Sequence, residues 1–224
     1  MITGLYGSSN DILHALIRLK VEALRDHFKS LVYRGDASAN SEEFDGLRRF
    51  TANMGTFDPV QPGLERLAEL AGGPGSAVQR GDIEGLLGMI DPRPEPDATY
   101  LVMHSKVFEH VARQGVLDSE VIHDPDLGIL SAVAGVPILI DDFAPVDESF
   151  EATTTSSIYA VVLGENTGLC GIYPSANEGA EIQVRGPFVK DDKDRSCYHL
   201  TWDIALAGFN SGAVARLKEI AFET

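Results

Sequence analysis

The first strong pattern in the chain is a helical one. Apolar residues recur at intervals of three and four near the start, at Leu13, Ile17, Val21, Leu24, Phe28 and Leu31. Side chains with this spacing share one face of an α-helix, so the pattern predicts a helix over residues 11–33. Ile12, Leu16, Leu19 and Ala23 widen the apolar face. At about 1.5 Å per residue the helix would be roughly 33 Å long, well above the average in globular proteins.

Near its C-terminus the chain changes to an alternating pattern. One set of alternate positions holds Tyr198, Leu200, Trp202, Ile204 and Leu206, and the other holds Cys197, His199, Thr201, Asp203 and Ala205. Side chains of a strand point to opposite faces in turn, so the pattern predicts one long half-buried strand over residues 196–207. Residues 213–222 are predicted to form a short terminal helix. Because the first helix and this strand are of similar length, we expect them to pack side by side.

Between these two segments, short helices, strands and irregular connections follow one another. Short helices are expected over residues 64–71, 83–90 and 105–114, with Asp82 and Ser105 as N-caps of the second and third. Strands are expected over residues 99–103, 135–140, 157–163, 169–173 and 181–185. Three prolines at alternate positions in residues 91–97 predict an extended linker and a subdomain boundary.

The composition restricts the class of protein. A chain of 224 residues with 44% hydrophobic content is long enough for a substantial core in one large or two small domains. A formal net charge of −16 opposes binding to nucleic-acid phosphates, and the longest basic patch is Arg48-Arg49. The N-terminus lacks the pattern of a secretory signal, and no apolar run is long enough to span a bilayer. We therefore expect a soluble protein that is made in the cytoplasm.

No familiar catalytic or metal-binding motif is recognisable. His104 and His110 lie six residues apart on a predicted helix, so they cannot share a metal ion from one face. The turn at residues 123–128 faintly resembles a calcium loop, but it lacks the third acid and has Gly135 where the loop needs a Glu at its twelfth position. The sequence thus predicts no enzyme, no catalytic residue, no cofactor and no metal ligand. One alternative stays open, a small α+β hydrolase or metal-binding protein that uses His104, His123 and Asp124.

Several segments occur in an order that is informative. These are Gly35-Asp36 and Phe44-Asp45-Gly46-Leu47 after the long helix, Tyr100–Met103, Ala134–Ile138, Ser156–Val161, and the last stretch with Trp202 and Ala215-Arg216-Leu217. The ordered set covers nearly the whole chain and resembles the major capsid proteins of tailed bacteriophages. The resemblance implies an α+β protein of the HK-97 type capsid fold, with a long spine helix, long peripheral β-strands and a compact α/β axial domain.

The resemblance also implies a division into domains and a function. The peripheral domain would hold residues 1–95 and 181–224, including the spine helix over residues 11–33 and the terminal strand, and the axial domain residues 96–180. The chain would be a structural major capsid protein of a tailed bacteriophage or prophage. It would form hexamers and pentamers of an icosahedral head that encloses DNA without binding it specifically. An encapsulin-like protein nanocompartment shell has the same fold and is the alternative.

Partners and contact residues follow from the same resemblance. The chain would associate with itself, with portal, scaffold or decoration proteins as further partners and no membrane, and would be found in the virion after assembly in the host cytoplasm. We expect Phe44, Asp45, Gly46 and Leu47 near contacts around local three-fold axes. We also expect His199, Thr201 and Asp203, on the polar face of the terminal strand, to contact neighbouring subunits.

The start of the chain departs from the family pattern. Family members carry an N-terminal arm and an extended hairpin loop before the spine helix, whereas only residues 1–10 precede the predicted helix here. We therefore expect a processed, truncated or reduced relative, and the sequence assigns no cross-linking residue.

Overall fold

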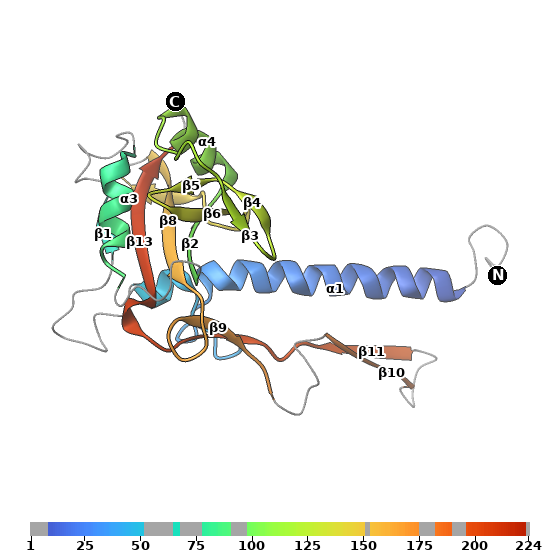
Figure 1. Ribbon diagram of the computed structural model, residues 1–224. Helices are drawn as coiled ribbons and strands as arrows, with labels where there is room; N and C mark the ends of the chain where they lie inside the picture. Colours follow the sequence, from blue (N-terminus) through green and yellow to red (C-terminus); the bar gives the residue numbers. More distant parts are fainter. Residues whose placement is uncertain are drawn as a thin grey trace. The chain divides into compact units, whose positions relative to one another are not determined.

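The computed structural model describes residues 9–51, 65–67, 78–90, 98–150, 153–174, 182–189 and 196–222 (Figure 1). The chain divides into two compact units. The first unit consists of Met1–Lys29 and Gly171–Ala205, and the second of Ser30–Cys170 and Leu206–Thr224. Each unit therefore joins segments from distant parts of the sequence. The peripheral and axial domains expected above follow the division used for the capsid family, and that assignment stays a prediction.

The second unit is built on a mixed sheet of seven strands in the order β1-β13-β8-β2-β6-β5, with β7 paired to β8. The strands are β1 (Glu65–Leu67), β2 (Thr99–Met103), β5 (Ala132–Val133), β6 (Val136–Ile140), β7 (Glu148–Phe150), β8 (Thr153–Val162) and β13 (Val214–Ala221). β13 runs parallel to β1 and antiparallel to β8, and β2 runs parallel to β6 and antiparallel to β8. The C-terminal strand thus pairs on both sides, once with a segment from early in the chain.

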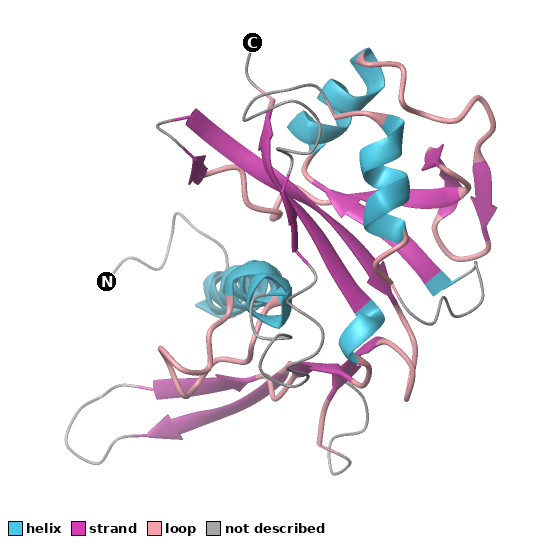
Figure 2. Cartoon of the chain, turned by 90° about the vertical axis from the view of Figure 1, so that its left-hand side faces the viewer, coloured by secondary structure: helices cyan, strands magenta, loops and turns pink. Residues whose placement is uncertain are grey.

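Two helices pack beside this sheet (Figure 2). α3 (Arg80–Leu87) contacts β13, and α4 (Ser105–Arg113) contacts β8. Their buried apolar residues join the strands in one core, whose largest fully buried side chains include Ile83, Leu86, Leu101, Met103, Val107, Ile158, Tyr159, Leu217 and Ile220. The predicted helix over residues 105–114 and the predicted strands over residues 99–103, 135–140 and 157–163 are confirmed, and the helix predicted over residues 83–90 is found three residues earlier, as α3.

The N-caps of these two helices differ from the prediction. Gln79 is the N-cap of α3, and its backbone N–H donates to Asp82 Oδ2 at 3.0 Å. His104 is the N-cap of α4, and its Nδ1 accepts the backbone N–H of Lys106 at 3.1 Å. Asp82 and Ser105 are therefore not the N-caps. Asp82 lies in the first turn of α3 and accepts the backbone N–H of the N-cap Gln79, and the imidazole of His104, not the Ser105 hydroxyl, caps α4.

The long N-terminal helix is confirmed as α1 (Ser9–Arg34). The remaining strands form three two-stranded sheets, which pair β3 (Ile122–Asp124) with β4 (Gly128–Leu130), β9 (Leu169–Ile172) with β12 (Ala205–Gly208), and β10 (Gln183–Val189) with β11 (Ser196–Thr201). The strand predicted over residues 169–173 is confirmed as β9, and the one over residues 181–185 is found at β10, two residues later.

Three predicted elements near the C-terminus and in the middle of the chain need correction. The single strand over residues 196–207 is wrong, because β11 ends at Thr201 and β12, which pairs with a different strand, begins at Ala205. The terminal helix over residues 213–222 is wrong, because this segment is β13, held between β1 and β8. The helix over residues 64–71 is wrong at residues 65–67, which form β1. The expected linker over residues 91–97 lies outside the described residues.

Candidate assembly surfaces

α1 carries two apolar faces with different surroundings. The six residues of the main stripe, from Leu13 to Leu31, are all half-buried, whereas Ile12, Leu16 and Leu19 are each more than half exposed. The exposed residues follow one another at intervals of four and three, so they form a stripe along one side of the helix. Contiguous exposed apolar surface of this kind is typical of an interaction site.

Within the first unit, Trp202 covers part of the half-buried face of α1. The ring of Phe28 lies against the ring of Trp202, with 4.9 Å between the ring centres and a 49° angle between their planes. Tilted aromatic pairs at this distance are favourable beyond the area that they bury. The contact joins α1 to the C-terminal stretch at Trp202, between β11 and β12, and the packing of the helix along one long strand stays a prediction.

The hairpin β3–β4 presents a second apolar patch, on the second unit. Val121, Leu127 and Ile129 are each more than half exposed. Asp124 shapes the turn between the strands, because its Oδ1 accepts the backbone N–H groups of Asp126 and Leu127, both at 2.9 Å. Its Oδ2 accepts the Tyr100 hydroxyl at 2.7 Å. These hydrogen bonds, that from Tyr100 foremost, lower the pKa of Asp124 below its ordinary value.

The hairpin β10–β11, on the first unit, exposes one large apolar side chain on each of its two faces. Val184 and Phe188 are exposed, and the Phe188 ring meets the His199 ring edge-on at 5.4 Å between centres. His199 and Thr201 on β11 are exposed, as is Asp203 beyond it. These three residues lie on accessible surface, and their role in subunit contact stays a prediction.

The segment Phe44–Leu47 is placed against the end of α1 in the second unit. Phe44 and Asp45 are half-buried, while Gly46 and Leu47 are buried. Gly46 donates its backbone N–H to the Gly35 carbonyl at 2.9 Å, and Asp45 Oδ1 accepts the backbone N–H of Ala37 at 3.0 Å. The segment thus closes the loop after the helix. Its expected place near three-fold contacts stays a prediction.

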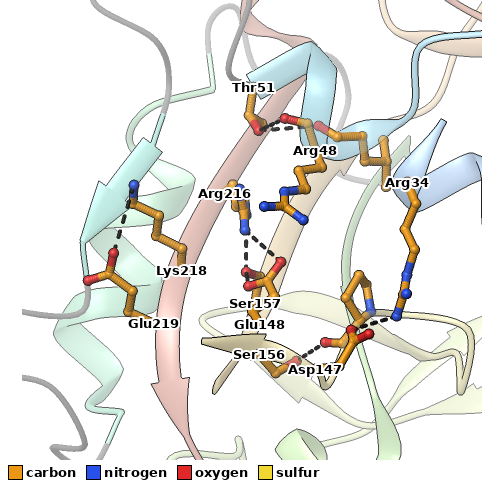
Figure 3. A network of polar contacts seen from close by, with 12 residues as sticks. Arg34, Arg48, Thr51, Asp147, Glu148, Ser156, Ser157, Arg216, Lys218 and Glu219 are labelled. Atoms are coloured by element: carbon orange, nitrogen blue, oxygen red, sulfur yellow. Dashed lines mark hydrogen bonds and ion pairs between the residues drawn. The ribbon is translucent and has the colours of Figure 1, made fainter. Parts of the chain in front are cut away.

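A buried polar network, which the sequence patterns did not indicate, lies beside this segment (Figure 3). Arg216 on β13 contacts Glu148 Oε1 on β7 at 2.6 Å and donates from Nε to Ser157 Oγ on β8 at 3.0 Å. Both side chains of the ion pair are less than a tenth exposed. Next to it, burial raises the pKa of Tyr159 to about 12, with the Arg216 charge acting in the opposite direction. An arginine inside the apolar run Val214–Leu217 was the one signal available for this network.

The residues of the hydrolase alternative have other roles. His104 caps α4, the carboxylate of Asp124 forms the hairpin turn, and His123 is exposed on β3. No group of three or more His, Cys, Asp or Glu residues that could hold a metal ion occurs in the described part of the chain. Among the described helices, none is both long and apolar enough to cross a membrane.

Comparison with known proteins finds likeness in structure and not in sequence. No family model matches the chain, and no curated protein matches it in sequence. The holo-SrpI encapsulin complex of Synechococcus elongatus is similar in structure, with a TM-score of 0.69, 19% identity, and coverage of 98% of this chain and 70% of the encapsulin chain. The capsid of an empty GTA particle is also similar, with a TM-score of 0.58, 17% identity, and coverage of 95% of this chain and 66% of the capsid chain.

These likenesses establish the fold class. The chain is an α+β protein with the HK-97 type capsid fold, as the sequence resemblance implied. It spans about two thirds of the length of both proteins, since it covers 70% of one and 66% of the other.

Proposed function

We propose that the chain is the subunit of a protein shell and associates with copies of itself into a closed container. The observation that carries this proposal is the TM-score of 0.69 to an encapsulin over 98% of the chain. In such proteins a subunit with the capsid fold is repeated by symmetry, and many weak contacts between the repeated subunits close the shell. On this proposal the chain acts through its geometry and is not an enzyme.

The exposed apolar patches support this proposal. The stripe on α1 and the β3–β4 hairpin give each of the two units one patch of large apolar side chains, and the β10–β11 hairpin adds one exposed apolar side chain on each face. A shell subunit needs contacts in several directions, because each copy has neighbours on several sides. The seven predicted contact residues, Phe44 to Leu47 with His199, Thr201 and Asp203, are proposed to lie at or beside these contacts. The peripheral and axial domain assignment is part of the same proposal.

Two kinds of container fit the fold. We favour the head of a tailed bacteriophage or prophage, built from hexamers and pentamers, because the ordered segments of the sequence resemble its capsid proteins. Portal, scaffold or decoration proteins would then be partners, and the virion would be the location. The net charge of −16 supports a wall that encloses DNA without binding it specifically. An encapsulin-like compartment is the second candidate, favoured by the higher TM-score of the encapsulin.

Assembly of the purified full chain tests the proposal. Size-exclusion chromatography with light scattering and electron microscopy should show closed particles of uniform size. Nucleic acid or co-purified protein inside particles from the native host then separates the two kinds of container. A chain that stays a monomer at every salt and protein concentration would contradict a self-assembling shell subunit.

A pair of matched variants tests the stripe on α1. Leu16→Asp places a charge in the exposed apolar stripe and should reduce assembly strongly, since a buried unpaired carboxylate is costly. His14→Asp places the same charge at an exposed position on the opposite side of α1 and should leave assembly near that of the wild type. Equal effects of the two variants would show that the stripe is not a contact surface.

A further inference from the structure

A hollow on the second unit gathers arginines in a strongly acidic protein. Arg34, Gly35, Asp36, Arg48 and Arg49 line it. The whole chain has 18 lysines and arginines against 34 aspartates and glutamates. The three arginines thus make the local charge of this hollow opposite in sign to the net charge of the chain. Whether positive charge remains for a ligand depends on the groups that already pair with these arginines.

Two of these arginines are held by carboxylates of the same unit. Arg34 Nη2 lies 2.6 Å from Asp147 Oδ1. Arg49 Nε lies 3.7 Å from Asp36 Oδ1, and Arg49 Nη2 donates to Ser38 Oγ at 3.1 Å. Both guanidinium groups are thus positioned in advance, and they lose less conformational entropy when a further ligand arrives.

Arg48 differs from its neighbours. Its side chain is exposed, and within the described ranges no carboxylate forms an ion pair with it. Figure 3 shows its guanidinium between those of Arg34 and Arg216, the latter already paired with Glu148. Two nearby acids are also engaged, since Asp36 in the hollow accepts from Ser38 and Asp45 accepts the backbone N–H of Ala37. Arg48 therefore carries a positive charge that no carboxylate among the described residues of the unit neutralises.

We infer that this hollow binds a carboxylate of a second copy of the chain, with Arg48 as the main contact and Arg34 beside it. The inference rests on the proposed shell function and names one contact in it. Guanidinium groups match carboxylates in geometry and bind them through paired N–H groups. Any neighbouring copy offers many carboxylates, and copies with a net charge of −16 repel one another unless local pairs of opposite charge offset the repulsion. The same net charge disfavours nucleic-acid phosphate as the occupant.

Chemical cross-linking identifies the occupant. Arg48→Lys keeps the positive charge and supplies an amine, which a carbodiimide joins to a carboxylate in direct contact. Particles assembled from a mixture of ¹⁵N-labelled and unlabelled Arg48→Lys chains should yield peptides that join position 48 of one chain to an Asp or Glu of another. Mass spectrometry recognises these peptides because each contains one labelled and one unlabelled half. Arg113→Lys, at an exposed position on α4 paired with Glu109, is the matched control and should yield fewer such peptides.

Charge reversal gives a second readout. Arg48→Glu should raise the protein concentration needed for assembly about tenfold, because a carboxylate would then face a carboxylate. Circular dichroism and Trp202 fluorescence check that the variant is folded. Assembly like that of the wild type, without mixed-isotope cross-links at position 48, would overturn the inference while the shell function stands. Loss of enclosed nucleic acid with unchanged assembly would instead assign the hollow to phosphate. A wild-type chain that never assembles would overturn both proposals.

Discussion

Gly46 and Gly35 lie so close together that neither has room for a side chain. Gly46 donates its backbone N–H to the Gly35 carbonyl at 2.9 Å. A Cβ atom on Gly46 would lie 2.5 Å from the Leu31 carbonyl oxygen and 2.8 Å from the Gly35 nitrogen. A Cβ atom on Gly35 would lie 2.2 Å from the Phe44 carbonyl oxygen. The two glycines therefore let the segment Phe44–Leu47 cross directly over the end of α1.

Gly46→Ala should destabilise the subunit by about 2–3 kcal/mol, because the added methyl group meets backbone atoms that cannot move independently. Urea unfolding followed by circular dichroism measures the change. Gly81→Ala is the matched control, since a Cβ atom there meets nothing within 4 Å and the residue lies in α3. It should be neutral or stabilising by up to about 1 kcal/mol. Equal free energies of unfolding for the two variants would contradict the close crossing.

The buried ion pair leads to a second prediction. Glu148→Gln leaves Arg216 charged in a site that is less than a tenth exposed and should cost about 3–5 kcal/mol of unfolding free energy. The double variant Glu148→Leu with Arg216→Met should recover most of this loss, because it removes both charges. Thermal or urea unfolding of the single and double variants measures the coupling.

The exposed pair on α4 is the control for the buried one. Glu109 and Arg113 lie 3.3 Å apart with side chains 65% and 71% exposed. Glu109→Gln should change the free energy of unfolding by less than about 0.5 kcal/mol, since water and salt screen exposed pairs. If the free energy of unfolding of Glu148→Gln is no lower than that of Glu109→Gln, then water or another group pairs with Arg216 in the variant.

The sequence predicted the long helix and much of the central sheet, because these elements have patterns of their own. The stripe from Leu13 to Leu31 indicates a helix without any reference to the rest of the chain. β13 was missed for the opposite reason. Val214, Leu217 and Ile220 are spaced as in a helix, yet the segment pairs with β1 and β8 and is buried along most of its length. Pairing with distant strands therefore outweighed local preference.

The assembly surfaces were only partly predictable. The pattern grouped Ile12, Leu16 and Leu19 with the rest of the apolar face, whereas the structure covers one stripe and exposes the other. Which stripe stays open depends on where Trp202 packs, and no local pattern contains that information. Arg48 was similarly visible only as part of a short basic pair, and its lack of a carboxylate partner in the described structure emerged from the surrounding contacts.

The turn of the β3–β4 hairpin leads to a prediction about pH. Tyr100, followed by the backbone N–H groups of Leu127 and Asp126, lowers the pKa of Asp124. A carboxyl with a lowered folded pKa adds stability above its unfolded pKa, about 3.9 for an aspartate, and loses it as the pH falls through the folded value. Tyr100→Phe should raise the pKa of Asp124 toward the ordinary value and weaken this dependence on pH below about 4.

Carboxyl ¹³C chemical shifts, followed by NMR as the unassembled subunit is acidified, measure the pKa of Asp124. Tyr173→Phe removes a hydroxyl from an exposed residue elsewhere and should leave that pKa unchanged. An Asp124 pKa that is the same in Tyr100→Phe as in the wild type would show that the backbone donors alone lower it.

The contact between Phe28 and Trp202 gives the fourth prediction. Phe28→Ala removes the ring that covers one side of Trp202, so water should reach the indole and its fluorescence emission should shift to longer wavelength. The loss of the aromatic pair and of its buried area should cost about 1–3 kcal/mol. Trp202 is the only tryptophan of the chain, so the tryptophan emission reports on the surroundings of this one residue.

Leu16→Ala is the control for Phe28→Ala, because Leu16 lies on the exposed stripe of the same helix. In the unassembled subunit Leu16→Ala should leave the emission of Trp202 unchanged. If the stripe is a contact surface, both variants should lower the stability of assembled particles.

Urea unfolding of Phe28→Ala gives a second measurement. Unfolding followed at Trp202 should begin at lower urea than unfolding followed by circular dichroism, because the first unit would loosen while the sheet of the second unit keeps its core. Coincident transitions in that variant would mean that the two units unfold together and that the ring contact is not what holds α1 to the C-terminal stretch.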